Sequence, residues 1–306
     1  PLFHWGPIPW GFYLVLSAAF GFMLHVRKRS RQKYSEACRP VLGNRVDGWA
    51  GKLIDLIAVF APLAGTATTF SLATPLLAGA ISNVTGIPQS TGLTLVILVV
   101  VCAIYTFSVY FGMKGVQLSA ATCTWLFFGL LAYVFFFGGQ TRFIIEEGIT
   151  ALGNMTQNFI GLSTWTDSLR TSSFPQTWTI FYWAYWMVWC VAVPFFIGSI
   201  SKGRTLRQVI LGGYVFGLSG TFTSFIIMGN YGLGLQMHGK LDVLSAYAAD
   251  GNLYQAILDI LGQLPLSKAV LVLLVLCMIT FYSTSFDSIT MVASTYTYKE
   301  LKSDEE

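Results

Sequence analysis

Charged side chains are scarce in this sequence. Only 10% of its 306 residues are Asp, Glu, Lys or Arg, whereas 54% are hydrophobic. A soluble globular domain carries about 25% charged residues, so the shortage excludes that class. It also excludes a nucleic-acid-binding protein despite the formal net charge of +4, because the chain as a whole carries so little charge. We therefore expect an all-α polytopic protein of the cell inner (plasma) membrane, with the lipid bilayer as a partner.

The sequence also lacks the residue patterns of enzymes and metal sites. Its three histidines, His4, His25 and His238, show no ligand spacing. No nucleophile–base pair, glycine-rich phosphate loop or paired-carboxylate motif is present. The five cysteines contain no CxxC pair, so neither a disulfide nor a metal site is indicated. We expect packing roles for the cysteines, no enzymatic activity and no cofactor.

Seven apolar windows dominate the chain instead, each long enough for a bilayer span of about 20 residues. They lie at about 7–26, 53–79, 91–112, 116–139, 177–199, 206–229 and 266–290. If alternate loops face the cytoplasm, 14 of the 18 Lys and Arg residues lie on that side. The positive-inside rule then places the start of the chain outside and its end in the cytoplasm.

The whole chain, 1–306, reads as one transmembrane domain truncated at both ends, because it begins with Pro1 and stops soon after an apolar window. Two connecting regions are long. Region 140–176 has helix-like apolar periodicity, which predicts an amphipathic helix lying along the outer surface. Region 230–265 contains an apolar stretch at 253–261, which predicts a short outer helix placed like a lid.

Prolines interrupt two of the windows. Pro7 and Pro9 lie at the start of the first, and Pro194 lies in the fifth. A proline removes a helix hydrogen bond and frees a carbonyl group. In membranes such backbone is tolerated where it lines a cavity, and discontinuous helices mark binding sites in secondary transporters. The alternative interpretation is a simple proline kink.

An aromatic stripe opens the fifth window. Its members fall at i, i+4, i+7, i+8 and i+11, which is one helical face: Trp178, Tyr182, Tyr185, Trp186 and Trp189. A dense π surface suits a diffuse cation such as a quaternary ammonium group. The alternative is an interfacial aromatic belt, but a belt occupies one turn and this stripe continues for three.

The last window holds the most polar stretch, 280–288. Hydroxyl oxygens are hard ligands that suit Na⁺, although Ser and Thr also bond to carbonyls of their own helix. Asp287 and Asp55 are ionisable groups in or beside apolar windows, so each is a functional candidate. Asp55 lies one turn after Lys52, which favours a solvated helix end for it.

Four segments, in order along the chain, resemble motifs of the betaine/carnitine/choline transporter (BCCT) family. The opening Phe3-His4-Trp5-Gly6 with Trp10 and Tyr13 is similar to FHWG…W..Y, and the segment 178–189 is similar to WTxFYWAWWxxW. Segment 200–205 resembles RISRGRT, and segment 284–288 resembles TSADS. The resemblance implies a LeuT-like transporter fold of twelve helices with inverted five-helix repeats, of which this chain would supply the fourth to the tenth. It also implies possible homotrimers.

The same resemblance implies the site residues. The substrate-binding aromatic box would comprise Trp5, Trp10, Tyr13, Tyr185, Trp186 and Trp189, with Trp178, Phe181 and Tyr182 on the same lining. A putative Na⁺ site would use the backbone of Phe281 and the side chains of Thr284 and Ser285. The implied function is import of a small quaternary-ammonium compound, such as glycine betaine, choline, carnitine or γ-butyrobetaine, by cation-coupled alternating access.

Departures from the family pattern bear on substrate and coupling. Tyr185 replaces the third aromatic of WAWW, and the usual SPFVG after Trp189 is absent, which leaves the substrate open. Ion-independent exchangers of the family carry Met at the position of Val193 and Arg near Cys123; this chain has neither. We therefore favour Na⁺ coupling. The alternatives are a proton-coupled carrier, an ion-independent antiporter, and a membrane sensor that does not transport.

Overall fold

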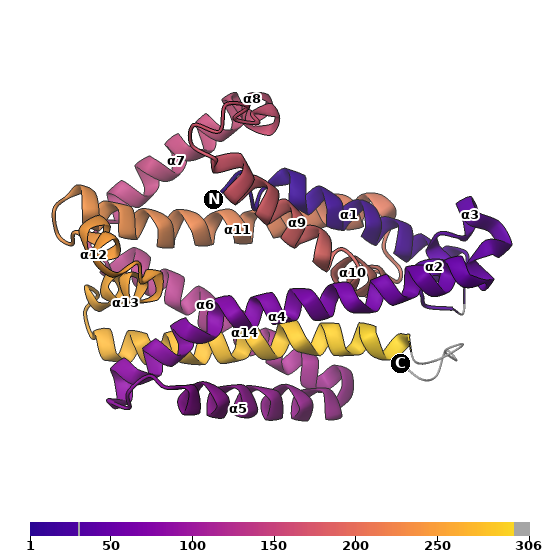
Figure 1. Cartoon of the computed structure of the whole chain (residues 1–306), viewed down its shortest axis with the longest axis horizontal. Coiled ribbons are helices and arrows are strands. Elements are labelled where there is room, and N and C mark those ends of the chain that lie inside the picture. Colours follow the sequence, from indigo (N-terminus) through magenta and orange to yellow (C-terminus); the bar gives the residue numbers. More distant parts are fainter. Residues whose placement is uncertain (30, 297–306) are drawn as a thin grey trace. The chain divides into compact units, whose positions relative to one another are not determined.

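The structure is a computed structural model that describes residues 1–29 and 31–296, apart from the side chains at 109, 112, 113, 116, 250, 287, 288, 291 and 295. Helices joined by turns make up this part of the chain, which contains no strand (Figure 1). The all-α prediction is confirmed for these residues.

Six helical segments are long and apolar enough to cross a membrane, or seven if one bent pair counts as a span. They are α1 with a π-helical end (Pro7–Val26), α4 (Trp49–Thr85), α5 (Thr91–Tyr110), α6 (Gly112–Phe137), α11 (Leu206–Met237) and α14 (Ser267–Thr295). The bent pair is α9 (Ile180–Trp189), preceded by the π-helical turn Pro175–Thr179, and α10 (Ala192–Ile200).

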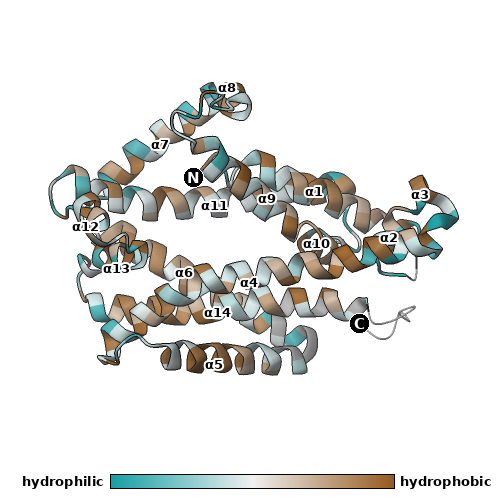
Figure 2. Ribbon diagram, viewed as in Figure 1, coloured by the Kyte–Doolittle hydropathy of each residue, from teal (hydrophilic) through white to brown (hydrophobic). Residues whose placement is uncertain are grey.

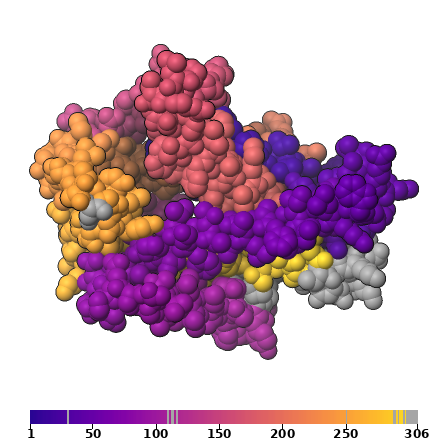
Figure 3. Space-filling model, in the orientation of Figure 1, coloured from indigo at the N-terminus to yellow at the C-terminus, as the bar shows by residue number. Residues whose placement is uncertain are grey.

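The apolar surface of α5 illustrates why a bilayer is required. Its side chains are almost all hydrophobic, as the brown ribbon in Figure 2 shows, yet only 11% of its span is buried within the protein. In Figure 3 this segment lies at the surface of the face shown. Water would not tolerate so much exposed apolar area, whereas lipid does. The multi-pass membrane prediction agrees with this pattern.

The chain divides into two compact units, and α4, α11 and α14 each contribute to both. The first unit contains 1–67, 157–222 and 288–306, of which the last ten residues lie outside the described part. It holds α1, α2 (Tyr34–Ala37), α3 (Arg39–Leu42), a 3₁₀ turn (Gly43–Asp47), α8 (Phe159–Thr164), α9 and α10. All nine residues of the predicted aromatic lining belong to this unit.

Close backbone packing joins α1 to α10 within the first unit. A Cβ atom added at Gly198 would lie 2.9 Å from the Gly21 nitrogen and 2.8 Å from the Phe20 Cβ. His25 places its Nε2 3.0 Å from the carbonyl oxygens of both Gly198 and Ser199, at the end of α10. This end of the helix pair is therefore held by main-chain contacts.

The second unit contains 68–156 and 223–287 and has its own apolar core. Leu130, Ile144, Tyr231, Leu258 and Leu271 are members of this core, and they come from five helices. Two of these are α7 (Thr141–Gln157) and α13 (Leu253–Gly262), with α12 (Val243–Asp250) preceding α13. On which side of a membrane α7 and α13 lie stays a prediction.

The prolines act differently in the two windows. Pro7 and Pro9 stand in the first turn of α1, where a missing N–H removes no helix hydrogen bond. The prediction of an interruption there is wrong. In the fifth window, α9 and α10 meet at a 48° bend (Figure 1). Pro194 lacks the N–H that would bond to the carbonyl of Cys190, which accounts for the break at Cys190 and Val191.

Candidate functional site

Trp186 of α9 is the centre of a ring cluster built with the start of α1. Its side chain is buried, with 5% exposed. The centroid of its indole lies 5.2 Å from that of Trp5, 5.8 Å from Trp10 and 4.6 Å from Tyr13. The structure thus brings the two predicted aromatic motifs together. We call Trp5, Trp10, Tyr13 and Trp186 the Trp186 cluster.

The other five predicted rings form a row along α9. Trp178 stacks on Tyr182 at 5.9 Å, Phe181 stacks on Tyr185 at 6.2 Å, and Tyr185 meets Trp189 edge to face at 6.1 Å. Trp178 and Phe181 are more than 40% exposed, so this α9 row is more open than the Trp186 cluster. Trp5 connects the two groups, because its ring also lies 5.9 Å from Tyr182.

Helix α11 supports the Trp186 cluster from behind. Trp10 donates from Nε1 to the Thr221 hydroxyl at 3.2 Å. A Cβ at Gly217 would lie only 2.6 Å from the Trp10 ring, so a glycine lets this ring lie against the helix backbone. No sequence pattern pointed to Thr221 or Gly217, because their role depends on a contact more than 200 residues away along the chain.

The turn before α9 is built around the Asp167 carboxylate. It accepts hydrogen bonds from the backbone N–H groups of Thr171, Ser172 and Ser173 and from the hydroxyls of Thr171 and Ser172. The Ser172 N–H and its neighbouring donors hold the pKa of Asp167 well below its usual range, because they stabilise the charged form. This turn leads directly into Pro175 and the first rings of α9.

A second link at this end of α9 involves His4, which the sequence pattern left without a role. His4 Nε2 and Thr179 Oγ1 share a hydrogen bond of 2.8 Å. The imidazole also stacks on the Tyr182 ring, with centroids 5.6 Å apart. The signal that could have identified His4 was its place between Phe3 and Trp5 in the opening motif.

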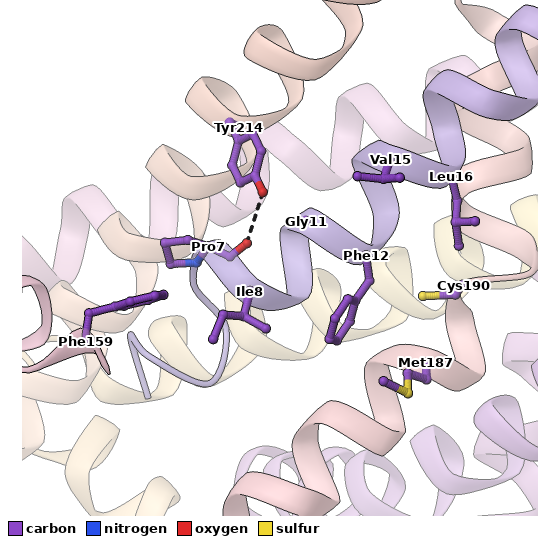
Figure 4. A pocket seen from close by; sticks show the side chains of 10 residues that line it. All are labelled: Pro7, Ile8, Gly11, Phe12, Val15, Leu16, Phe159, Met187, Cys190 and Tyr214. Atoms are coloured by element: carbon purple, nitrogen blue, oxygen red, sulfur yellow. Dashed lines mark hydrogen bonds between the residues drawn. The ribbon is translucent and has the colours of Figure 1, made fainter. Parts of the chain in front are cut away.

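An open apolar groove of about 690 Å³ lies on another face of α1 (Figure 4). Ile8, Gly11, Phe12 and Val15 follow at i, i+3, i+4 and i+7 along one side of the helix, and none of the nine predicted rings lines the groove. It contains no Trp and no charged side chain. The groove is therefore not lined by the predicted rings, and its own aromatic side chains are Phe12, Phe159 and Tyr214.

The chemical capacity of the Trp186 cluster lies in its ring faces. A quaternary ammonium group has no hydrogen-bond donor, so aromatic faces are its natural partners. The rings already touch one another, and a bound ammonium group has to replace one of these ring contacts. The described members of this cluster and the apolar residues packed on it, Phe12, Leu16, Cys190 and Val193 among them, carry no charge.

The predicted ion ligands lie on α14, in the second unit. Phe281, Thr284 and Ser285 occupy positions i, i+3 and i+4 of one continuous helix, so their ligand atoms share a face. The Thr284 hydroxyl donates to the Thr280 carbonyl at 2.8 Å, and a hydroxyl oxygen is a ligand type that suits Na⁺. Hydroxyl and carbonyl oxygens are ligand types that Na⁺ accepts, and the Na⁺ site on this helix stays a prediction.

Cys123 of α6 lies against this segment of α14. Its thiol makes side-chain hydrogen bonds with Thr280 and Thr284. A side chain at this position therefore reaches the segment that carries the predicted ion ligands. Unlike an arginine, a cysteine at this position brings no positive charge to the segment.

The two candidate aspartates differ. Asp55 accepts hydrogen bonds from the backbone N–H of Ser35 at 3.0 Å and from the Ser35 hydroxyl at 2.9 Å. It therefore holds α2 against α4 rather than ending a helix in solvent. The side chain of Asp287 lies outside the described residues.

Comparison with known proteins adds an independent finding. The sequence model of a family described as "BCCT, betaine/carnitine/choline family transporter" matches residues 1–305. A protein of Desulfitobacterium hafniense (strain Y51), named "Probable glycine betaine transporter", is 31% identical over 296 residues. The matched region covers 96% of this chain and 58% of that relative, so the chain spans less than two thirds of its length.

Proposed function

The chain belongs to the betaine/carnitine/choline transporter family, and from this membership we propose that it carries the substrate box and part of the ion site of a secondary transporter for a quaternary-ammonium compound. Transport would proceed by alternating access with Na⁺ as the coupling ion. The observation that carries the proposal is the Trp186 cluster, in which rings from two distant motifs meet around one buried indole.

Cation–π attraction supplies the physical basis for selecting such a substrate. It is worth roughly 2 kcal/mol or more when the cation is desolvated. Several ring faces in one site therefore compensate for the water that a trimethylammonium group loses on binding. The relative's name makes glycine betaine the first substrate to test, and the Tyr185 hydroxyl offers a donor to an anionic or hydroxyl group at the other end of the molecule.

We favour Na⁺-coupled transport over ion-independent exchange because of a contact between α6 and α14. The thiol of Cys123 contacts the segment that carries Thr284, and no basic side chain competes with a cation at that position. Proton coupling is the remaining alternative, with Asp287 as the carboxylate that would carry it. An Asp287→Asn variant that kept the full pH dependence of uptake would count against this alternative.

The test uses the full-length protein in proteoliposomes, with labelled glycine betaine, choline and carnitine. We expect accumulation of at least one of them when an inward Na⁺ gradient is applied, and none when K⁺ replaces Na⁺ at constant pH. Exchange that needs no gradient would contradict Na⁺ coupling. Binding without counterflow of labelled substrate would indicate a sensor and contradict transport altogether.

A further inference from the structure

His4 occupies an unusual place for a histidine, in the turn that precedes α1. Its side chain is 7% exposed, and rings surround it. It stacks on Tyr182 at 5.6 Å, faces Phe174 at 5.9 Å and meets Phe3 edge to face at 5.5 Å. A buried polar side chain of this kind needs a hydrogen-bond partner, and the Thr179 hydroxyl supplies one at 2.8 Å.

This hydrogen bond joins the starts of the two helices that carry the rings. His4 stands three residues before the first residue of α1, and Thr179 stands directly before the first residue of α9. The two residues are 175 positions apart in the sequence. Between the aromatic rings of α1 and α9 the contacts are apolar and non-directional, whereas this bond is directional and fixes one point.

The position of Trp5 follows from that of His4. The turn is short and internally bonded, since the Trp5 N–H donates to the Pro1 carbonyl at 3.0 Å and the Gly6 N–H donates to the Phe3 carbonyl at 3.3 Å. Trp5 therefore cannot shift independently of its neighbour. It is also the ring that touches both Trp186 and Tyr182.

We propose that His4 is a positioning residue for the aromatic box, which through Thr179 sets the spacing of Trp5 against Trp186. The proposal rests on the proposed function, because it assigns His4 a role in the binding of that substrate. A neutral imidazole suits this role, since it holds the turn without placing a cation among rings that are to bind one. Burial lowers the pKa of His4 to about 4, so the ring is neutral at pH 7.

The experiment compares two matched pairs in the full-length protein in proteoliposomes, with labelled glycine betaine. Thr179→Val removes the hydroxyl at nearly constant shape, and Thr179→Ser keeps it. His4→Leu removes the imidazole, and His4→Gln keeps a side-chain group that can hydrogen-bond. We expect Thr179→Val and His4→Leu to raise KM roughly tenfold, the effect of about one buried hydrogen bond, with kcat within about twofold of wild type.

The double variant His4→Leu/Thr179→Val distinguishes the loss of one shared hydrogen bond from two independent local effects of the single substitutions. We expect its KM to match that of the worse single variant, because one shared bond is lost once. We expect Thr179→Ser and His4→Gln to stay within about threefold of wild type. A lowered unfolding temperature with an unchanged KM would assign the bond a purely structural role and overturn the proposal.

The two proposals fail in different ways. If wild-type protein transports glycine betaine and Thr179→Val has the same KM, the positioning proposal alone is wrong. If wild-type protein takes up and exchanges none of the three labelled compounds, the proposed function is wrong, and the role of His4 in substrate binding falls with it.

Discussion

The two ends of helix α1 pack in opposite ways against the α9–α10 pair. At the Gly21 end, backbone meets backbone, and there is no space for even a methyl group at Gly198. At the Pro7 end, the contacts run through the side chains of Trp5, Trp10 and Tyr13. Main chains in contact cannot separate without breaking the helix pair, whereas rings rotate about their side-chain torsions. We call the Gly21 end the fixed end, because backbone holds it, and the ring end the adjustable end, because side chains and the single hydrogen bond between His4 and Thr179 hold it.

The bend at Cys190 and Val191 lies between the fixed end and the adjustable end. It divides α9, which carries the rings, from α10, which carries Gly198. The missing N–H of Pro194 weakens the helix at this point. A change in the ring contacts therefore does not have to disturb the glycine contact. Four predictions test or sharpen this comparison, from the largest expected effect to the smallest.

The largest effect should come from the fixed end. Gly198→Ala places a Cβ atom 2.8 Å from the Phe20 Cβ and 2.9 Å from the Gly21 nitrogen, and neither can move without its helix. We expect a loss of stability of about 3 kcal/mol, despite the better helix propensity of alanine. The measurement is the unfolding temperature of the full-length protein in detergent.

Gly212→Ala is the matched control, since no atom lies within 4 Å of a Cβ at that position in α11. It should be neutral or slightly stabilising. Equal unfolding temperatures of Gly198→Ala and Gly212→Ala would show that the contact between α1 and α10 is not tight. The Gly21 end of α1 would then not be fixed.

The next effect should come from the adjustable end and should concern binding more than stability. Trp186→Ala removes the buried indole from the Trp186 cluster and leaves Trp5, Trp10 and Tyr13 without their common partner. We expect substrate affinity to fall by about a hundredfold, from lost cation–π attraction and lost ring placement together. Trp186→Phe should retain part of the affinity.

Met187→Ala is the control for Trp186, because it changes the adjacent residue of α9, which lines the apolar groove instead. Its affinity should stay within about threefold of wild type. If Met187→Ala were the more damaging variant in an equilibrium binding assay, the groove rather than the ring cluster would be the substrate site.

A third variant tests the coupling of transport to Na⁺ and changes neither end of α1. Thr284→Val removes one proposed ion-ligand oxygen at nearly constant shape. We expect the Na⁺ concentration for half-maximal uptake to rise about tenfold, while the KM for substrate at saturating Na⁺ changes little. Thr280→Val, one turn earlier on the same helix, should alter the Na⁺ dependence far less. Loss of substrate affinity in Thr284→Val at every Na⁺ concentration would contradict the assignment.

The smallest effect should appear on acidification. The folded-state pKa of His4, about 4, lies below its ordinary value of 6.5, so between these values the unfolded chain binds more protons. The contribution of His4 to stability is therefore present above pH 6.5 and is lost as the pH falls towards 4. The ionisable side chain packed against it is that of Tyr182, whose ring stacks on the imidazole.

The unfolding temperature at pH 7 and pH 5 provides the measurement. We expect wild-type protein to lose about 2 °C more than His4→Gln between these values, since the Gln side chain does not titrate. An identical pH response of the two proteins would show that His4 is not held neutral by the fold.

The sequence predicted the helices well, because bilayer spans need long apolar windows and little else resembles them. The predicted windows were shorter than the helices. For example, α4 continues to Thr85, beyond the expected 79, since helices extend past the apolar core of a membrane. Motif resemblance predicted which rings form the box, whose role in binding stays a prediction, and helical phase predicted a single stripe. The structure divides that stripe, because adjacent residues such as Tyr185 and Trp186 point about 100° apart on a helix.

Long-range partners could not be predicted. Thr179, Gly217 and Thr221 matter only because α1 lies beside them, and no spacing rule relates positions so far apart. The role of Gly198 likewise depends on a helix crossing that sequence pattern does not encode. His4 was present in a resembling motif, but a single histidine beside tryptophans is not interpretable until its partner is known.

The glycine contact between Gly21 and Gly198 also bears on how this protein can change over evolutionary time. With one end of the helix pair held by backbone contacts, we expect single ring replacements at the other end to disturb the packing of the pair less than a replacement of Gly198. Tyr185, which stands where the family pattern has Trp, is such a replacement. Under the proposed function, exchange of aromatic residues one at a time would change the substrate while the glycine contact is kept.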